Sequence, residues 1–257
     1  MNTQHVDVTR DGDIVTVTLD WPEKRNALAA DVMRELTEAF REVGKSDATG
    51  VILAANGPVF SAGHDFADMA GADLVFMRRL LDTCTRLMTV VQTVPQPVIA
   101  RVHALATAAG CQLIASCDLA VAAEEAAFAI PGGKGGWFCT TPLVAVARNV
   151  GRKRALEMAF TGDAVDATTA TEWGLLNRAV PAADLEAATD DLLRRATRGS
   201  ALSKAIGKQA FYAQVDLDQH KAYAYAIEVM ASASQTHDAQ EGMQSFLQKR
   251  PPSFENR

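Results

Sequence analysis

The sequence has 257 residues, of which 48% are hydrophobic and 22% charged, and a formal net charge of −6 at pH 7. This length can bury a substantial core, and the composition is that of an ordinary globular protein rather than a disordered or fibrous one. The negative charge and the lack of a basic run give no electrostatic reason to bind nucleic acid.

The first third of the chain predicts two strands, a helix and a third strand. Residues rich in β-branched side chains, Val6–Thr9 and Ile14–Leu19, flank Asp11-Gly12-Asp13, which predicts a hairpin. Apolar residues recur at helical spacing from Ala30 to Val43, which predicts an amphipathic helix. The apolar run Gly50–Ala55 is typical of a short buried strand.

The middle of the chain continues to alternate helices and strands. A helix is predicted over Leu74–Val91, and the prolines that follow it end the helix before a strand at Val98–Val102. Ala109–Ser116 is a candidate helix, and Leu119–Ala122 is a further strand. Short apolar strands separated by helices predict an α/β layered core.

The end of the chain has few strand signals. Helical patterns dominate from Leu185 to Gln248, for example Tyr223, Ile227 and Met230 at helical spacing. We therefore expect two regions: a β-rich core over residues 1–181 and a helical region over residues 182–257.

The four cysteines, Cys84, Cys111, Cys117 and Cys139, form no CxxC pair, and no His-rich metal spacing is present. We expect free buried thiols in a reducing compartment and no metal. The first residues lack the basic and apolar segments of a secretory signal, and the apolar runs are too short to span a bilayer. The chain is therefore expected to be cytoplasmic, with no membrane partner.

Small side chains fill the stretch from Ala106 to Leu113. Such residues let another group approach main-chain N–H donors closely. The N-terminus of a helix beginning at Ala109 would aim free N–H groups and a partial positive charge at that group. This is the geometry of an oxyanion hole. The competing interpretation is that the small residues only allow tight helix–strand packing.

These motifs resemble the crotonase (enoyl-CoA hydratase/isomerase) superfamily. The resemblance rests on collinear segments: Arg25-Asn26-Ala27-Leu28, Phe60-Ser61-Ala62-Gly63-His64-Asp65, Val102–Leu113 with Cys117-Asp118, Leu156–Asp163 and Glu241–Arg250. The stretch Ala106–Gln112 and the segment Phe138–Pro142 are similar to hallmarks of the "enoyl-CoA hydratase domain-containing" subgroup.

The resemblance implies a spiral of ββα units followed by a C-terminal helical trimerisation region that forms part of the coenzyme A site. It also implies an acyl-CoA substrate, no cofactor other than coenzyme A as part of that substrate, and a homotrimer or a dimer of trimers. Periodicity alone would not have indicated these points.

Two main-chain amides, those of His64 and Ala109, correspond to the donors of the family's oxyanion hole. Neither residue type removes an N–H, so both donors can be present. The His64 ring could act as an acid or base. The simpler alternative is that the ring caps the turn at residues 63–65 or contacts a phosphate.

The two glutamates that activate water in enoyl-CoA hydratases align with Gln112 and Gly132. Gln112 can bind a water molecule but cannot take its proton, and Gly132 has no side chain. Losing one positioned base costs a factor of about 10² to 10⁴. Residues that could replace the missing acids are Glu124, Glu125, Lys134, Cys139, Thr140 and Thr141. Cys139 is a possible nucleophile, but an inert buried thiol is the simpler interpretation.

By the same resemblance, a set of basic, aromatic and loop residues would contact the substrate or coenzyme A. They are Lys24, Arg25, Ala62, Asp65, Trp137, Phe246 and Lys249. Charge attraction to phosphate is the physical reason for the basic members. For Arg250, phosphate binding and a solvated helix end are comparable interpretations, and Trp137 could line the pocket or pack in the core. The glycine-rich loop Gly132–Gly136 lacks the order of a P-loop and is expected to be a mobile loop beside the acyl pocket.

The predicted function is an acyl-CoA thioester-binding protein with a backbone oxyanion hole, acting as a lyase or isomerase in fatty acid metabolism. Ordinary hydratase activity is doubtful because of Gln112 and Gly132. The alternative is a non-catalytic acyl-CoA-binding or assembly partner, and a third possibility is a ligand-free structural subunit.

Overall fold

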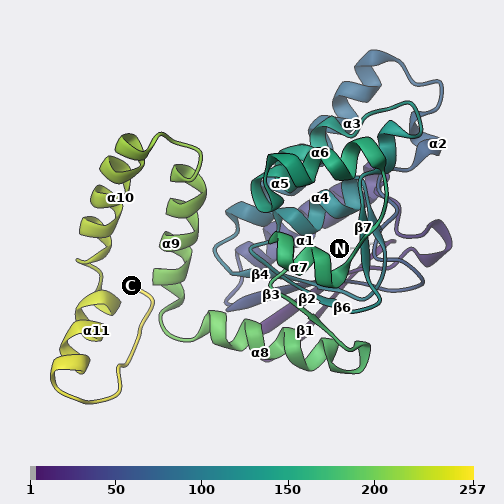
Figure 1. Ribbon diagram of the computed structural model, residues 1–257. Coiled ribbons are helices and arrows are strands. Elements are labelled where there is room, and N and C mark those ends of the chain that lie inside the picture. Colours follow the sequence, from purple (N-terminus) through teal and green to yellow (C-terminus); the bar gives the residue numbers. More distant parts are fainter. Residues whose placement is uncertain (1–3) are drawn as a thin grey trace.

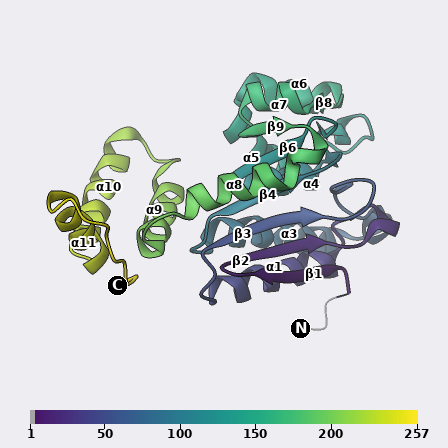
Figure 2. The ribbon, with the colours of Figure 1, turned by 90° about the horizontal axis from the view of Figure 1, so that it is seen from below.

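The computed structural model describes residues 4–257, and its centre is a six-stranded sheet (Figure 2). The strands lie in the order β1-β2-β3-β4-β6-β9. Only the first pair is antiparallel, and the others run parallel. Their bounds are β1 Val6–Asp11, β2 Ile14–Leu19, β3 Gly50–Ala55, β4 Val98–Val102, β6 Leu119–Ala123 and β9 Arg178–Val180.

The predicted hairpin is confirmed. Asp11 pairs with Ile14, which leaves a two-residue turn at Gly12 and Asp13. Gly12 has a φ of 57°, a left-handed conformation that favours glycine.

The sheet is buried on both faces, as its parallel strands require. In β3, Val51 and Leu53 point into the main core, while Ile52 points to a second apolar cluster. Three helices pack against this face of the sheet and contribute buried side chains to the main core: α1 (Ala30–Gly44), α3 (Leu74–Thr93) and α4 (Ala109–Ser116). The second cluster lies under α8 (Leu185–Thr197), through Leu185 and Leu193. The sheet is thus a middle layer between helices.

Shorter elements surround this layer. A second sheet has the order β5-β7-β8, with bounds β5 Ala106–Thr107, β7 Ala127–Ala129 and β8 Val165–Asp166. The remaining helices of the core are η1 Pro22–Lys24, α2 Phe66–Met69, η2 Pro131–Gly133, α5 Thr140–Val150, α6 Arg152–Thr161, α7 Ala167–Trp173 and η3 Ala182–Asp184.

Three C-terminal helices stand apart from the core as an arm (Figure 1). They are α9 (Ala201–Gln214), α10 (Gln219–Ala233) and α11 (His237–Leu247). The last strand ends at Val180, but α8 packs on the sheet, so the projecting part begins at α9. The predicted division at residue 182 is not tested by this arrangement and stays a prediction.

A buried ion pair joins the arm to the core. Lys208 of α9 lies 2.7 Å from Asp118, at the start of β6, and also donates to the carbonyls of Val91 and Gln96 at 2.9 Å each. The hydroxyl of Tyr212 donates to the other oxygen of Asp118 at 2.9 Å. Burial disfavours the charged form of each residue. It therefore raises the pKa of Asp118 and lowers the pKa of Lys208. The pair is held by these mutual contacts.

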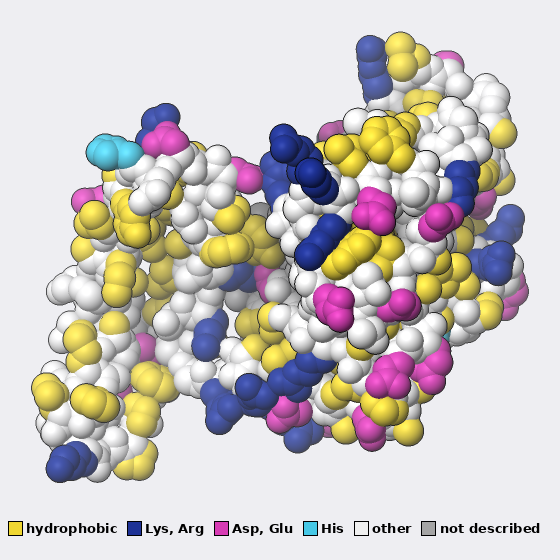
Figure 3. Space-filling model, viewed as in Figure 1, with side chains coloured by type: hydrophobic (Ala, Val, Ile, Leu, Met, Phe, Trp, Pro, Cys, Tyr) yellow, Lys and Arg dark blue, Asp and Glu magenta, His cyan; other side chains and the backbone are white. Residues whose placement is uncertain are grey.

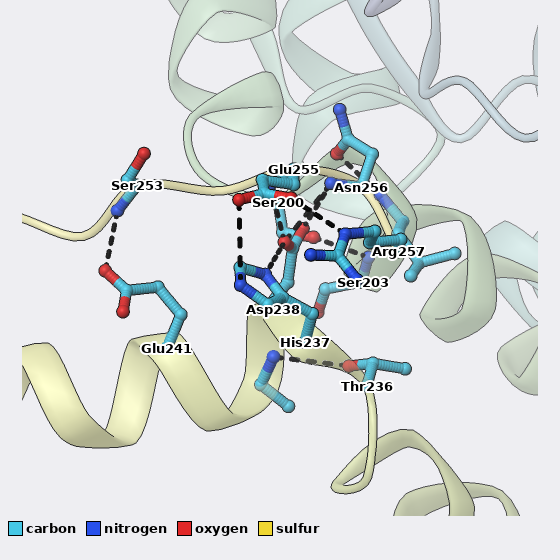
Figure 4. Close-up of polar contacts among 12 residues, drawn as sticks. Ser200, Ser203, Thr236, His237, Asp238, Glu241, Ser253, Glu255, Asn256 and Arg257 are labelled. Atoms are coloured by element: carbon cyan, nitrogen blue, oxygen red, sulfur yellow. Dashed lines mark hydrogen bonds and ion pairs between the residues drawn. The ribbon is translucent and has the colours of Figure 1, made fainter.

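The C-terminal tail folds back as a strap across α11 and α9 (Figure 4). Asp238 of α11 is 3% exposed and accepts hydrogen bonds from the amides of Glu255 at 2.7 Å and Asn256 at 3.0 Å. The Asn256 side chain in turn accepts the amide of Ala201 at the start of α9. Burial alone would raise the pKa of Asp238, but hydrogen bonds from Ser200, Glu255 and Asn256 outweigh burial and hold the pKa below its usual range.

We expect Asp238→Asn to lower the free energy of unfolding by about 2 kcal/mol at neutral pH, because hydrogen bonds to a charged acceptor are lost. The folded pKa lies below the unfolded value of about 3.9. The carboxylate therefore contributes stability above that value, and the contribution is lost as the pH falls through the folded pKa. Urea unfolding at pH 7 and pH 3 measures this, with Asp7→Asn on exposed β1 as the control. An equal deficit at both pH values would contradict the account.

Candidate oxyanion site

The loop at residues 60–64 is fastened along the chain that leads into α4. The amide of Phe60 donates to the Leu105 carbonyl at 2.9 Å, and the amide of Thr107 donates to the Ser61 carbonyl at 2.9 Å. The hydroxyl of Thr107 donates to the Ala62 carbonyl at 2.9 Å. Two segments far apart in the sequence thus lie side by side next to the start of α4.

Two glycines permit this close approach. Gly63 has a φ of 83°, and a β-carbon on it would lie 3.0 Å from the Thr107 carbonyl oxygen and 3.3 Å from the Ala109 nitrogen. A β-carbon on Gly110 would lie 2.7 Å from the Ser61 carbonyl oxygen, which is too short for a carbon–oxygen contact, and this oxygen belongs to the backbone and cannot rotate away. Any larger residue would separate the loop from the helix, so the glycines bring His64 beside the first turn of α4.

Both predicted donors are free. Ala109 is the first residue of α4, so its N–H has no partner inside the helix. Within residues 4–257, neither this amide nor that of His64 donates to a protein acceptor. The preceding amide, that of Ala108, is bound to the Ala129 carbonyl at 2.9 Å. The helix dipole adds a partial positive charge at the same place.

Ala108 carries backbone strain at this turn. It has a φ of 49° and a ψ of −115°, a conformation that L-residues rarely adopt. Its carbonyl nevertheless accepts the amide of Gln112 and so starts the helix. Such strain costs about 1–3 kcal/mol, whereas the entropy of a glycine costs about 0.5–1 kcal/mol.

We therefore expect Ala108→Gly to raise the free energy of unfolding by about 1 kcal/mol, since relief of strain exceeds the entropy of glycine. The same substitution at Ala115, inside α4, is the matched control and should lower stability by about 1 kcal/mol. Chemical denaturation measures both. Two variants that are destabilised alike would show that Ala108 is not strained.

The His64 ring takes a position that the sequence does not predict. Its Nδ1 lies 3.2 Å from the Leu28 carbonyl oxygen, so Nδ1 carries the proton and donates it. Asp65 caps the helix that follows, α2, where its carboxylate accepts the Ala67 amide at 2.9 Å. Because the ring bonds to Leu28 and not to the turn at residues 63–65, the expectation that it caps this turn is wrong, and its contact with a phosphate stays a prediction. Nε2 is buried without a partner in the described chain. Burial lowers the pKa of His64, partly opposed by Leu28 and Asp68.

Two buried polar residues hold the loop in place, and their role is not evident from the sequence. Asn26 is fully buried; its side chain accepts the Trp21 amide at 2.8 Å and donates to the Val59 carbonyl at 3.0 Å. Ser61 is also fully buried, and its hydroxyl donates to the Asn26 carbonyl at 2.8 Å. Both residues stand in segments that carry the family resemblance, but the sequence does not show that their side chains join these segments. Asn26 adopts a φ of 50°, which asparagine tolerates better than most residues.

The two positions aligned with catalytic glutamates differ in their surroundings. Gln112 is 5% exposed, and its side-chain oxygen lies 3.9 Å from the Cys84 sulfur. Gly132 has no room for a side chain, because a β-carbon there would lie 2.3 Å from the Trp137 carbonyl oxygen and 2.5 Å from the Cys139 sulfur. The Gly132 carbonyl also accepts the amides of Gly135 and Trp137, which closes the loop on itself.

Three of the six candidate replacements for the missing acids are held by local contacts or protonated, and Glu124 and Glu125 are exposed. Lys134 pairs with Asp163 at 2.6 Å. The hydroxyl of Thr140 donates to the Phe138 carbonyl. Burial raises the pKa of Cys139, against a hydrogen bond with Gly132, so its thiol is protonated at neutral pH. All four cysteines are free and buried.

The candidate coenzyme A residues fall into two groups. The carbonyl of Arg25 accepts the Ala62 amide at 3.0 Å, so Lys24 and Arg25 flank the loop that carries His64. Trp137 is 43% exposed rather than packed in the core. Phe246, 83% exposed, and Lys249 lie at the end of α11, which is well separated from α4 within one chain (Figures 1 and 2).

Arg250, the position with two open interpretations, pairs with Glu241. Its Nη2 lies 2.8 Å from the Glu241 carboxylate, whose other oxygen accepts the Ser253 amide. Arg250 therefore belongs to the strap.

Within residues 4–257, no three or more His, Cys, Asp or Glu side chains gather as a metal-binding group. No helix in that part of the chain combines the length and apolar character needed to cross a bilayer.

Comparison with known proteins agrees with the fold and the motifs. The sequence model of the family described as "Enoyl-CoA hydratase/isomerase" matches residues 9–257. Mouse "Enoyl-CoA hydratase domain-containing protein 3, mitochondrial" is 42% identical, covering 95% of this chain and 82% of its own length. A solved structure of an enoyl-CoA hydratase from Mycobacterium smegmatis is 42% identical with a TM-score of 0.94, covering 97% of this chain and 98% of that one. Human enoyl coenzyme A hydratase domain-containing protein 3 is 39% identical with a TM-score of 0.94, covering 98% and 100%.

The chain therefore belongs to the enoyl-CoA hydratase/isomerase family, with the crotonase fold. Within that family it groups with the enoyl-CoA hydratase domain-containing proteins. The names of the mouse, rat and human relatives place those proteins in mitochondria. This finding contradicts the expected cytoplasmic location, and that prediction is wrong.

Proposed function

We propose that this protein binds acyl-CoA thioesters and polarises the thioester carbonyl with the main-chain amides of His64 and Ala109. The observation that supports the proposal is the pair of unpartnered amides on segments that Gly63 and Gly110 bring together. Donors that are fixed before the substrate arrives stabilise an anion without reorganisation.

The rest of the contact set follows from the family. Lys24 and Arg25 attract the phosphates of coenzyme A, and Ala62, Asp65 and Trp137 border the acyl group beside the loop of His64. Phe246 and Lys249 reach the coenzyme A bound by a neighbouring copy, since α11 lies far from α4 in its own chain (Figure 1). No further cofactor is part of the proposal.

A homotrimer or dimer of trimers accompanies this proposal. Side chains on α10 such as Tyr223, Ile227 and Met230 are 64%, 61% and 79% exposed, although all three are apolar or aromatic. Figure 3 shows hydrophobic side chains over the surface of the arm. Exposed apolar surface of this kind is typical of an interface.

Hydration of enoyl-CoA is expected to be slow. A hydratase needs groups that take and return protons at water and carbon, and Gln112 cannot ionise. Position 132 offers no side chain and no space for one. The proposed chemistry is therefore stabilisation of an enolate-like or tetrahedral anion, in an isomerase or lyase step.

Calorimetry with crotonyl-CoA, together with loss of its enoyl absorbance, tests this proposal. We expect saturable binding of crotonyl-CoA, and turnover lower by a factor of at least about 10² than in a family member that has both glutamates. Absence of binding would contradict the proposal.

The closed surroundings of Gly132 also favour a second candidate function, a non-catalytic acyl-CoA-binding or assembly partner. In that case acyl-CoA would bind tightly and leave chemically unchanged, with no exchange of its protons.

A further inference from the structure

One buried polar atom in the site has no partner. The Nε2 atom of His64 is closed off from solvent and pairs with nothing in the described chain. Leaving such an atom unpaired costs about 1–3 kcal/mol. His103, in contrast, has its Nε2 atom 2.8 Å from the Gly57 carbonyl oxygen.

The proton on the other ring nitrogen decides what Nε2 can do. Nδ1 lies 3.2 Å from the Leu28 carbonyl oxygen, and a carbonyl can only accept, so Nδ1 is the protonated nitrogen. Nε2 then carries the lone pair. Burial lowers the pKa of the ring, and Asp68 is the nearby charge that opposes this effect. The imidazole is neutral at pH 7 and basic at Nε2.

We propose that Nε2 of His64 is the acid–base group of this site and removes a proton from the α-carbon of the bound acyl thioester. The proposal rests on acyl-CoA binding as proposed above, because the same residue supplies one of the two amides. Nε2 is covered in the chain without ligand, so this role requires the side chains that cover it to move when the acyl thioester binds. The two positions that align with the family's catalytic glutamates carry Gln112 and Gly132, and neither side chain can ionise.

The imidazole of His64 alone can carry the proton through the whole reaction. Nε2 takes the α-proton, the C–H electron pair forms a double bond to the carbonyl carbon, and the thioester oxygen holds the negative charge at the two amides. The imidazolium then returns its proton to carbon, and the carbonyl reforms. Return to the α-carbon exchanges hydrogen, and return to the γ-carbon of a 3-enoyl thioester shifts its double bond. One base and one anion site suffice for this chemistry.

Exchange of the α-protons of butyryl-CoA in D2O, followed by proton NMR, tests this role directly. We expect the wild-type chain to catalyse exchange and His64→Gln to be slower by about 10²- to 10⁴-fold. The glutamine amide can still donate to Leu28, and the main-chain N–H at position 64 remains, so butyryl-CoA should still bind. Asp7→Asn, on exposed β1, is the control and should exchange like the wild type.

The outcomes separate the two proposals. Exchange by His64→Gln at the wild-type rate, or wild-type binding of butyryl-CoA without any exchange, would overturn the role of the ring and leave acyl-CoA binding intact. If the wild-type chain does not bind butyryl-CoA, both the proposed function and the role of the His64 ring are contradicted. A second readout needs no turnover: the ¹⁵N resonance of Nε2, assigned by its loss in His64→Gln, should shift on addition of butyryl-CoA. An unchanged resonance would overturn the proposal.

Discussion

Gly132→Glu is expected to lower the free energy of unfolding by about 3 kcal/mol and to restore no hydratase activity. A β-carbon at this position would lie 2.3 Å from the Trp137 carbonyl oxygen and 2.5 Å from the Cys139 sulfur. The first of these is a backbone atom, so relief requires the loop to move rather than a side chain to rotate. Overpacking of this kind costs about 1–3 kcal/mol or more.

Gly135→Glu is the matched control in the same loop, because a β-carbon there contacts only the Gly132 carbonyl oxygen at 3.6 Å. We expect it to change stability by no more than about 0.5 kcal/mol. Urea denaturation of both variants, with crotonyl-CoA hydration assayed in parallel, makes the comparison. A stable Gly132→Glu variant that hydrates crotonyl-CoA would show that the loop tolerates the family's second glutamate.

Lys208→Met is expected to lower the free energy of unfolding by about 3–5 kcal/mol. The change keeps much of the volume of the side chain but leaves Asp118 as a buried carboxylate facing only Tyr212 and the Val98 amide. It also leaves the carbonyls of Val91 and Gln96 without their donor. Since Lys208 joins α9 to the core, the arm should loosen together with the loss of stability.

Lys204→Met tests whether the effect belongs to the pair rather than to any lysine of α9. Lys204 is exposed on the same helix, so its replacement should change stability by no more than about 0.5 kcal/mol. Thermal unfolding of the full chain gives both values, and hydrogen exchange of the α9 amides reports the loosening. Equal and small effects in the two variants would show that the buried pair contributes little.

The long periodic segments were predictable from the sequence. The helices observed at Ala30–Gly44 and Leu74–Thr93 and the strand at Gly50–Ala55 lie where the apolar spacing places them. The three-residue strand Ala127–Ala129 and the two-residue strand Val165–Asp166 were not predicted. They have too few residues for a period, and their pairing with each other depends on tertiary contacts.

The site was predictable in part. Small residues before Ala109 indicated a helix start with free donors, and the structure has that helix start. The positions that matter most depend on contacts between distant residues. The ring of His64 is oriented by Leu28, and the space at Gly132 is filled from Cys139 and Trp137. No local pattern encodes such contacts, so the sequence alone does not show that position 132 has no space for a side chain.

The infrared carbonyl band of butyryl-CoA labelled with ¹³C at the thioester carbon tests the two-amide site most directly. Main-chain donors at positions 64 and 109 should lower the frequency of the bound carbonyl relative to the free thioester, because they draw charge onto its oxygen. Replacing Ala109 by lactic acid through nonsense suppression exchanges that N–H for an ester oxygen, and part of the shift should then disappear. A bound carbonyl that absorbs at the frequency of the free thioester would contradict the account.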